Sequence, residues 1–246
     1  MRTILSIDGG GIKGIIPGMV LAELENRLKI RTANPNAYIA DYFDFFAGTS
    51  TGGILTCLLL CPSKEDPKKP RFTAKEALNL YVENGSKIFS TKGLKKILAD
   101  IGWVTEKYDA SILEEILQTY FDDVKLSELI KPCIVTAYNI ELRKAHFFRQ
   151  VVAKSRGDNR DFYVRDVCRA TSAAPTYFSV AEVYSLAGVR YPLLDGGIFA
   201  TNPSLSAFVE IKRSPEELIP KDVYILSLGT GASKKSYDRI IENQEN

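Results

Sequence analysis

The feature that most constrains the fold is the pentapeptide Gly-Thr-Ser-Thr-Gly at 48–52, because of the two segments that it joins. Residues 42–47 form an aromatic, almost continuous apolar run, which is typical of a central strand in a parallel sheet. Residues 51–61 form a second apolar run, which indicates a buried helix. Glycine permits a sharp turn between the two. The sequence therefore predicts an α/β domain with Ser50 on a strand-to-helix turn, the arrangement called a nucleophile elbow.

Apolar periodicity predicts that further strands and helices alternate along the chain. Ile16, Val20, Leu24 and Leu28 recur every fourth residue, which indicates a first helix with these side chains on its apolar face. Alternation of this kind favours a three-layer α/β/α fold with a mainly parallel central sheet. The other predicted strands are 3–7, 132–139, 145–150, 178–184, 189–194 and 223–228, and the other predicted helices are 73–84, 109–121, 163–172 and 204–212.

A serine nucleophile needs a base to take its proton, and the choice of base is narrow in this chain. The only histidine, His146, lies in a strand-like run, where a packed histidine is the simpler interpretation. Asp195 is followed by Gly196 and Gly197, and a carboxylate becomes a useful base when its site raises its pKa or places it against the hydroxyl. Taken alone, however, Ser50 and Asp195 also fit ordinary turns.

A glycine-rich segment at 9–14, Gly-Gly-Gly-Ile-Lys-Gly, lies between the first predicted strand and the first predicted helix. Its backbone N–H groups would form an anion site near the positive end of the helix dipole, which in acyl transfer is an oxyanion hole. The dinucleotide fingerprint fits less well, because it needs an acidic residue about twenty positions later at the end of a strand. Glu23 and Glu25 lie within the predicted helix instead. Taken alone, the segment fits a structural turn as well as an anion site. The candidate oxyanion-hole residues are Gly9, Gly10, Gly11 and Lys13.

Five segments of the chain, in this order, resemble the motifs of the patatin-like phospholipase family. Each motif is short, but their order and spacing fit over nearly the whole chain. Lys13 stands where the family motif has arginine, so this position keeps its charge but lacks a planar, bidentate guanidinium. The segments are Asp-Gly-Gly-Gly-Ile-Lys-Gly at 8–14, Gly-Thr-Ser-Thr-Gly at 48–52, Arg-Ala-Thr-Ser-Ala-Ala-Pro-Thr-Tyr-Phe at 169–178, Asp-Gly-Gly at 195–197 and Ser-Leu-Gly-Thr-Gly at 227–231.

The resemblance implies a lipid acyl hydrolase that acts by two-step acyl transfer on the fatty acyl esters of glycerolipids. Asp195 would accept the proton of Ser50, and Ser50 would attack the ester carbonyl. Backbone N–H groups around Gly10 and Gly11 would stabilise the oxyanion, and water activated by Asp195 would hydrolyse the acyl-enzyme. No metal and no organic cofactor is implied. The elbow and turn glycines would be Gly48, Gly52, Gly196 and Gly197.

Other functions remain open at this point. The same dyad could transfer the acyl group to an alcohol, or the domain could bind lipid without catalysis; a nicotinamide- or nucleotide-binding protein fits least well. We expect a single catalytic domain over 1–233 and a polar tail over 234–246. The tail would be either disordered or truncated, and truncation is an option because members of the family often continue past the last predicted strand.

Composition bears on partners and location. The 246 residues carry a net charge of +2, which gives no basic footprint for nucleic acid. Four cysteines without metal-type spacing, no leader and no apolar run of membrane-spanning length predict a reducing, cytoplasmic chain. The glycerolipid substrate that the resemblance implies would require peripheral, reversible contact with membranes. The oligomeric state is not predicted. Two lysine clusters fit either solvated loops or contacts with anionic lipid headgroups. They are Lys64, Lys68 and Lys69, and Lys92, Lys95 and Lys96.

Overall fold

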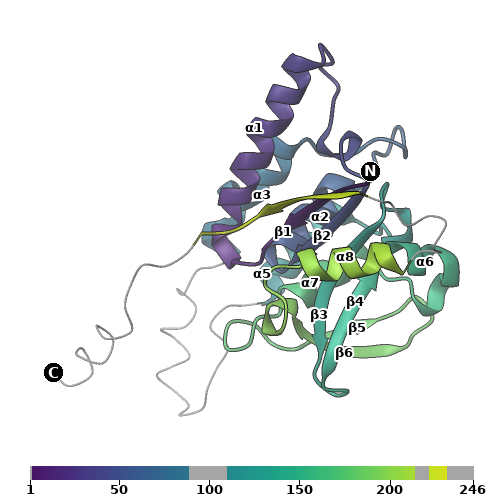
Figure 1. The fold of residues 1–246 in the computed structure, drawn as a ribbon. Helices are drawn as coiled ribbons and strands as arrows, with labels where there is room; N and C mark the ends of the chain where they lie inside the picture. Colours follow the sequence, from purple (N-terminus) through teal and green to yellow (C-terminus); the bar gives the residue numbers. More distant parts are fainter. Residues whose placement is uncertain (1, 89–109, 214–221, 232–246) are drawn as a thin grey trace, which may run out of the picture.

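The computed structural model describes residues 2–88, 110–213 and 222–231, and within them the chain forms one seven-stranded sheet flanked by helices (Figure 1). The strands are β1 (Arg2–Ile7), β2 (Phe45–Thr49), β3 (Cys133–Asn139), β4 (Lys144–Arg149), β5 (Ala181–Tyr184), β6 (Arg190–Asp195) and β7 (Val223–Leu228). The α-helices are α1 (Ile15–Arg31), α2 (Thr51–Leu60), α3 (Ala74–Ile88), α5 (Ala110–Phe121), α6 (Gln150–Arg156), α7 (Val164–Thr171) and α8 (Ser204–Lys212).

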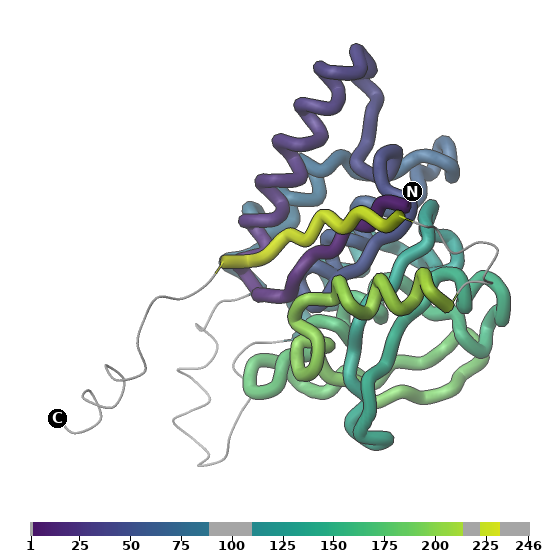
Figure 2. Tube along the Cα trace, viewed as in Figure 1, coloured from purple at the N-terminus to yellow at the C-terminus, as the bar shows by residue number. Residues whose placement is uncertain are grey.

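Four neighbouring strands, in the order β3, β2, β1 and β7, are parallel, and antiparallel strands extend the sheet beyond β3. Strand β7 comes from the end of the described chain, yet it pairs with β1 from Arg2↔Val223 to Ile7↔Leu228. Figure 2 shows these two segments side by side, in purple and yellow. Parallel neighbours need crossover connections, and helices supply them here. The predicted α/β/α fold is confirmed.

Successive side chains of a strand point to opposite faces, and both faces of the sheet are buried over β2, β3 and most of β1, whereas the edge strand β7 is only partly covered. One face packs against α1, α2, α3, α5 and α7 and forms the larger core. The other face packs against α8, which lies in front of the sheet in Figure 1. The smaller core under α8 consists of Ile4, Phe45, Ala47, Ile134, Ala207 and Ile211. The nearly continuous apolar sequence of β2 follows from this double burial.

Strand β3 brings two distant segments end to end. One of its edges pairs with β4 from Ile134 to Asn139. Along its other edge, residues 133–136 pair with β2 in parallel, and residues 137–139 pair with β6 in the antiparallel direction. Thr49 pairs with Thr136, and Asp195 pairs with the next residue, Ala137. The end of β2 and the end of β6 therefore meet at adjacent positions of one strand.

The predicted apolar face of the first helix is partly wrong. Ile16 and Val20 are 45% and 46% exposed, although Leu24 and Leu28 do pack against the core. The buried positions of α1 are Pro17, Gly18, Leu21 and Glu25. Glu25 is only 3% exposed, and its carboxylate accepts hydrogen bonds from the backbone N–H groups of Ile39 and Ala74. Apolar periodicity predicts apolar side chains on the buried face of a helix, but here the charged Glu25 lies on that face.

Helix α6 was not predicted from the sequence. It follows β4 without a loop, and its sequence is mostly polar. The buried Gln150 side chain donates hydrogen bonds to the backbone oxygens of Ser127 and Leu129, at 3.3 and 3.0 Å. These long-range bonds hold the first turn of the helix, and a local apolar pattern does not predict them.

Candidate active site

Ser50 lies between the last residue of β2 and the first residue of α2, as the elbow motif predicts. Its backbone angles are φ 54° and ψ −125°, which a non-glycine residue rarely adopts. Such strain persists only where the surroundings hold it. Here the Ser50 N–H donates a 2.8 Å hydrogen bond to Oγ1 of Thr171. On the preceding residue, the Thr49 hydroxyl donates a 2.7 Å hydrogen bond to the Ala200 backbone oxygen.

The two glycines of the elbow allow the helix to approach the strands closely. A Cβ atom at Gly52 would lie 2.1 Å from the backbone oxygen of Ile7 at the end of β1. A Cβ atom at Gly48 would lie 2.4 Å from the backbone oxygen of Gly52. Neither contact involves a flexible side chain, so a larger residue at either position would displace α2. The turn glycines therefore fix where Ser50 stands.

Asp195 ends β6 and is 5% exposed. Its Oδ1 accepts a 2.6 Å hydrogen bond from the N–H of Gly197, and the Ser50 side chain also hydrogen-bonds to the carboxylate. Burial raises the pKa of Asp195 to about 6, and the hydrogen bonds from Ser50 and Gly197 offset part of that rise. A carboxylate in this state is a stronger base than one in water. The structure thus places Asp195 against Ser50.

The glycine-rich segment forms a short 3₁₀ turn beside Ser50. The Gly9 N–H donates to the backbone oxygen of Thr201 at 3.0 Å, and the Lys13 N–H donates to that of Gly10 at 3.2 Å. Within the described residues, no acceptor lies on the N–H groups of Gly10 and Gly11. Of the candidate oxyanion donors, these two amides are therefore the ones that remain available. The Lys13 side chain is exposed.

A cavity of about 580 Å³ opens over these groups. Its polar lining includes Ser50, Ser172 and Asp195. Apolar side chains from α2, α3, α5 and the segment after α7 make most of the rest of the wall, among them Ile54, Leu80, Tyr81, Ile88, Leu113 and Phe178. An elongated apolar group attached to a polar, reactive carbonyl matches this distribution.

Three contributors to the site were not singled out from the sequence. Thr171 accepts the N–H of Ser50, and the backbone oxygen of Ala173 accepts the N–H of Asp195 at 2.9 Å. The Thr230 hydroxyl donates to the Gly9 backbone oxygen at 2.9 Å and so ties the glycine turn to the end of β7. Their only signal in the sequence was membership of the segments at 169–178 and 227–231.

His146 lies on β4 and is not part of the cavity wall. Its ring packs against Phe148, Phe162 and Tyr191, with centroid distances of 4.7, 6.3 and 5.1 Å. Burial, with a smaller contribution from the nearby Arg160 charge, lowers the pKa of His146 to about 4. A packed histidine is the interpretation that the sequence favours, and the structure agrees with it.

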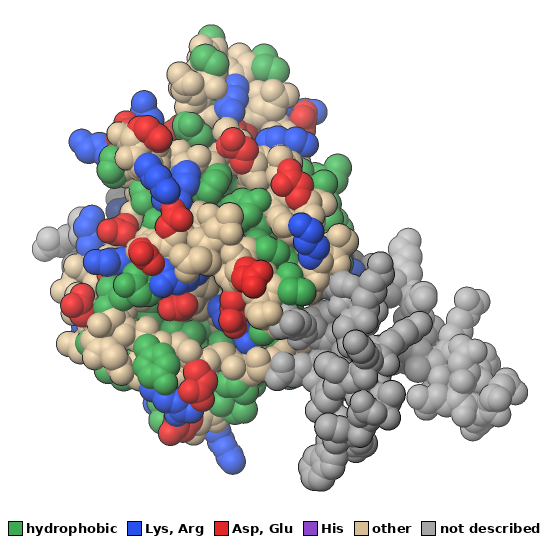
Figure 3. Space-filling model, turned by 180° about the vertical axis from the view of Figure 1, so that it is seen from behind, with side chains coloured by type: hydrophobic (Ala, Val, Ile, Leu, Met, Phe, Trp, Pro, Cys, Tyr) green, Lys and Arg blue, Asp and Glu red, His purple; other side chains and the backbone are tan. Residues whose placement is uncertain are grey.

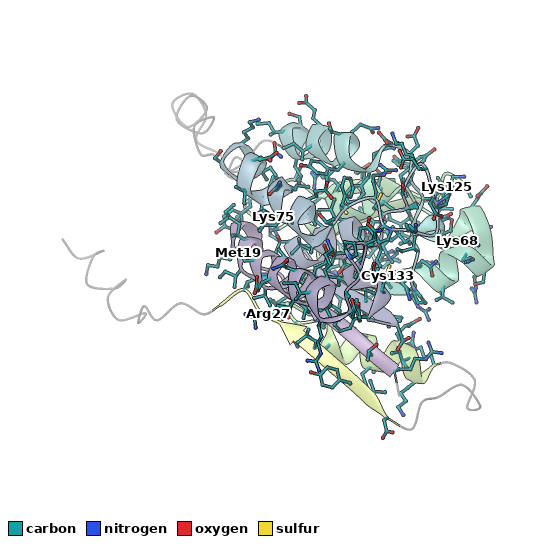
Figure 4. All side chains as sticks on the ribbon, turned by 90° about the horizontal axis from the view of Figure 1, so that it is seen from above. Met19, Arg27, Lys68, Lys75, Lys125 and Cys133 are labelled. Atoms are coloured by element: carbon teal, nitrogen blue, oxygen red, sulfur yellow. The ribbon has the colours of Figure 1, made fainter. Side chains whose placement is uncertain are left out.

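The lysine cluster at Lys64, Lys68 and Lys69 lies away from the cavity. Helix α2 runs from Ser50 back across the sheet, and its last residue, Leu60, accepts the N–H of Ile130 just before β3 begins. The loop that follows is therefore at the opposite edge of the sheet from Ser50. Figure 4 shows Lys68 on the same side of the molecule as Lys125. The second cluster, Lys92, Lys95 and Lys96, and the tail from 234 lie outside the described residues.

The described residues contain neither a candidate metal cluster nor a candidate membrane-spanning helix. Among them, no group of three or more His, Cys, Asp or Glu side chains could hold a metal ion. No helix in the described ranges is both long and apolar enough to cross a membrane. Over the face shown in Figure 3, Lys and Arg side chains are interspersed with Asp and Glu.

Residues 5–208 match the family described as patatin-like phospholipase. The chain belongs to this family. Patatin-like protein 2 from Arabidopsis thaliana is 35% identical over 252 residues, which cover 94% of this chain and 60% of the relative. Patatin-like protein 1 from Oryza sativa subsp. indica is 33% identical over 94% of this chain and 59% of the relative.

A third relative, named probable inactive patatin-3-Kuras 1, from Solanum tuberosum, is 34% identical over 96% of this chain and 64% of its own length. This patatin-like chain thus spans about 60% of the length of these three curated relatives. The crystal structure of VipD from Legionella pneumophila aligns at 16% identity with a TM-score of 0.42, over 98% of this chain and 52% of that one.

Proposed function

We propose that this patatin-like domain is a lipid acyl hydrolase that cleaves fatty acyl esters of glycerolipids with a Ser50–Asp195 dyad. The observation that carries the proposal is the buried Asp195 carboxylate, hydrogen-bonded to a serine on a strained turn at the polar part of an apolar cavity. Family membership supports a lipid ester as the substrate class. Such a substrate requires reversible contact with a membrane or micelle surface.

The first step is attack of the Ser50 oxygen on the ester carbonyl as Asp195 takes the hydroxyl proton. The carbonyl oxygen becomes an oxyanion, and the donors that stabilise it are the N–H groups of Gly10 and Gly11, which have no acceptor among the described residues. Lys13 adds positive charge near the same turn. The tetrahedral intermediate then collapses, the proton passes from Asp195 to the leaving alcohol, and an acyl-Ser50 ester remains.

The second step repeats the first with water. Asp195, again ionised, takes a proton from a water molecule in the place vacated by the alcohol, and the water oxygen attacks the acyl carbonyl. Collapse of the second intermediate returns the proton to Ser50 and releases the fatty acid. No histidine is used at either step.

The decisive test is covalent labelling. A fluorophosphonate probe followed by peptide mapping should modify Ser50, and the Ser50→Ala protein should be folded, unlabelled and inactive on short-chain nitrophenyl esters and on a panel of glycerolipids. Turnover at the wild-type rate in a folded Ser50→Ala protein would exclude Ser50 as the nucleophile. Absence of labelling in the wild type, together with retained lipid binding, would favour a catalytically silent lipid-binding domain.

A further inference from the structure

The two proposed oxyanion donors belong to peptide units whose carbonyl oxygens are hydrogen-bonded within the protein. The Gly10 N–H shares its peptide unit with the Gly9 carbonyl, whose oxygen accepts a 2.9 Å hydrogen bond from the Thr230 hydroxyl. The Gly11 N–H shares its unit with the Gly10 carbonyl, which accepts the Lys13 N–H at 3.2 Å. In a planar trans peptide the C=O and N–H bonds point in opposite directions. A bond that fixes the carbonyl therefore also fixes the direction of the donor.

The two bonds differ in origin. The Lys13 bond belongs to the 3₁₀ turn itself, so the Gly11 amide is oriented by its own segment. The unit between Gly9 and Gly10 instead depends on a side chain that lies 221 positions away in the sequence. Both residues joined by this unit are glycines, which restrict backbone rotation least. Without an external bond the unit can turn over and direct its carbonyl, rather than its N–H, toward an oxyanion.

Thr230 is placed to hold that one peptide unit. It is 8% exposed and lies two residues after the end of β7. A Cβ atom at Gly10 would lie 2.3 Å from Oγ1 of Thr230, so the hydroxyl lies directly against the glycine turn. Gly10 is exposed and forms part of the cavity wall, whereas Thr230 does not. Thr230 can therefore act on a substrate in the cavity only through the turn.

We propose that Thr230 is a positioning residue for the oxyanion hole. Its hydroxyl holds the Gly9 carbonyl, so that the Gly10 N–H is directed into the cavity and is a stronger donor. A hydrogen bond at the carbonyl end polarises a peptide unit, and hydrogen bonds in a chain strengthen one another. The Thr230 hydroxyl, the peptide unit and the developing oxyanion form such a chain. This inference rests on the Ser50–Asp195 hydrolase proposed above.

The test compares a ligand that forms an oxyanion with one that does not. The first is a long-chain alkyl trifluoromethyl ketone: the Ser50 oxygen adds to its carbonyl carbon, Asp195 takes the hydroxyl proton, and the ketone oxygen becomes an oxyanion. The second is the fatty alcohol of equal chain length. Their two inhibition constants, measured against a soluble nitrophenyl ester, separate oxyanion binding from binding of the alkyl chain.

Thr230→Val removes the hydroxyl and keeps the shape of the side chain. We expect kcat to fall roughly tenfold and inhibition by the ketone to weaken by the same factor, which is less than the loss of about 10²–10³-fold on removal of a whole donor. The KM and the inhibition constant of the alcohol should stay within about twofold of wild type, because an interaction made only in the transition state leaves ground-state binding unchanged.

Two further variants serve as controls. Thr230→Ser keeps the hydroxyl and should restore most of the lost kcat and ketone inhibition. Thr119→Val removes a bond of the same kind, from a threonine hydroxyl to the Glu115 backbone oxygen at 2.9 Å, but on an exposed part of α5 outside the cavity wall. It should leave both inhibition constants unchanged.

The ratio of the two inhibition constants does not depend on the fraction of folded enzyme. It stays informative if Thr230→Val is unstable, and Thr230→Ala supplies the same ratio if Thr230→Val does not fold. An unchanged ratio would overturn the role of Thr230, whether both ligands bind as in the wild type or both bind more weakly. Failure of the wild type to label at Ser50 with fluorophosphonate would instead refute the hydrolase mechanism itself, and the inference with it.

Discussion

At the scale of single residues, burial decides the chemistry. Asp195 and His146 are both removed from water, and burial disfavours the charged form of each. The pKa of Asp195 therefore rises from 3.8 to about 6, whereas that of His146 falls from 6.5 to about 4. The carboxylate becomes a base suited to neutral pH, and the imidazole stays uncharged in an aromatic environment.

Activity should follow the ionisation of Asp195. In the proposed mechanism the carboxylate form accepts the proton of Ser50, so kcat/KM should rise with pH through an apparent pKa of about 6 and level off above it. Measurement of kcat/KM for a soluble nitrophenyl ester between pH 4.5 and 8.5 checks this. A profile that declines from pH 5 to pH 7 would contradict a carboxylate base.

Asp195→Asn should lose activity and gain stability. Loss of the base should lower kcat/KM on the order of 10³–10⁵-fold, close to the effect of Ser50→Ala. The folded pKa lies above the unfolded one, so the stability that the carboxyl contributes is present below pH 3.8 and is lost as pH rises through about 6. An uncharged amide avoids that loss, and urea unfolding at pH 7.5 should show a gain on the order of 2 kcal/mol. A destabilised Asp195→Asn protein would contradict the burial argument.

His146 should make the fold sensitive to acid rather than take part in catalysis. Its folded pKa is depressed, so protonation of the unfolded chain costs the native state stability as pH falls from 6.5 toward 4. In His146→Phe, the change in the free energy of unfolding between pH 7.5 and pH 4.5 should shrink by on the order of 2 kcal/mol. Activity of this variant at pH 7.5 should stay near the wild-type value. An inactive but folded His146→Phe protein would reopen the question of a histidine base.

At the scale of elements, local pattern located the strands and helices, and long-range contacts decided their faces. The predicted strand at 3–7 and helix at 204–212 match β1 and α8 to within one residue, because their apolar residues lie where the elements are buried. Helix α1 was located correctly, but its predicted face was not, because Glu25 bonds to groups that are distant in sequence. Helix α6 was not predicted for a similar reason, because Gln150 in its first turn bonds to backbone groups that are distant in sequence.

The buried Glu25 should therefore matter more than a surface glutamate of the same helix. Glu25→Ala leaves the backbone N–H groups of Ile39 and Ala74 and the partner Lys29 without the carboxylate. We expect a loss of roughly 2–4 kcal/mol in the free energy of unfolding. Glu23→Ala, which removes an exposed ion pair with Arg27 one turn away, should cost less than about 0.5 kcal/mol. Similar losses in the two variants by urea denaturation would contradict the role of Glu25 as an anchor.

At the scale of the whole molecule, the candidate site and the first lysine cluster lie at opposite ends of the parallel strands. Ser50, the glycine turn and Asp195 lie where the parallel strands end, whereas the loop with Lys64, Lys68 and Lys69 lies where β2 and β3 begin. Ion pairs of Lys64 with Asp122 and of Lys69 with Asp66 indicate ordinary solvated surface there. In the proposed function, a lipid surface that delivers an ester to the cavity would approach the edge that holds Ser50 and Asp195.

This separation predicts a null result for the first lysine cluster. Replacing Lys64, Lys68 and Lys69 with glutamine should leave hydrolysis of anionic vesicles within about twofold of wild type at physiological salt, where exposed charges are screened beyond about 8 Å. Activity on a soluble ester serves as the control for folding. A selective loss on vesicles would place this loop at the membrane. For the second cluster the prediction from sequence stands. Replacing Lys92, Lys95 and Lys96 with glutamine should lower activity on vesicles but not on a soluble ester.

The sequence by itself determined the alternation of strands and helices, the glycine-flanked turn at Ser50 and the identity of the candidate base, because turns and apolar runs are local properties. Only the tertiary structure decided that Ser50 and Asp195 meet, since that depends on β2 and β6 ending at the adjacent residues Thr136 and Ala137 of β3. It also decided the raised pKa of Asp195, because burial is a property of the packed molecule and no short sequence pattern encodes it.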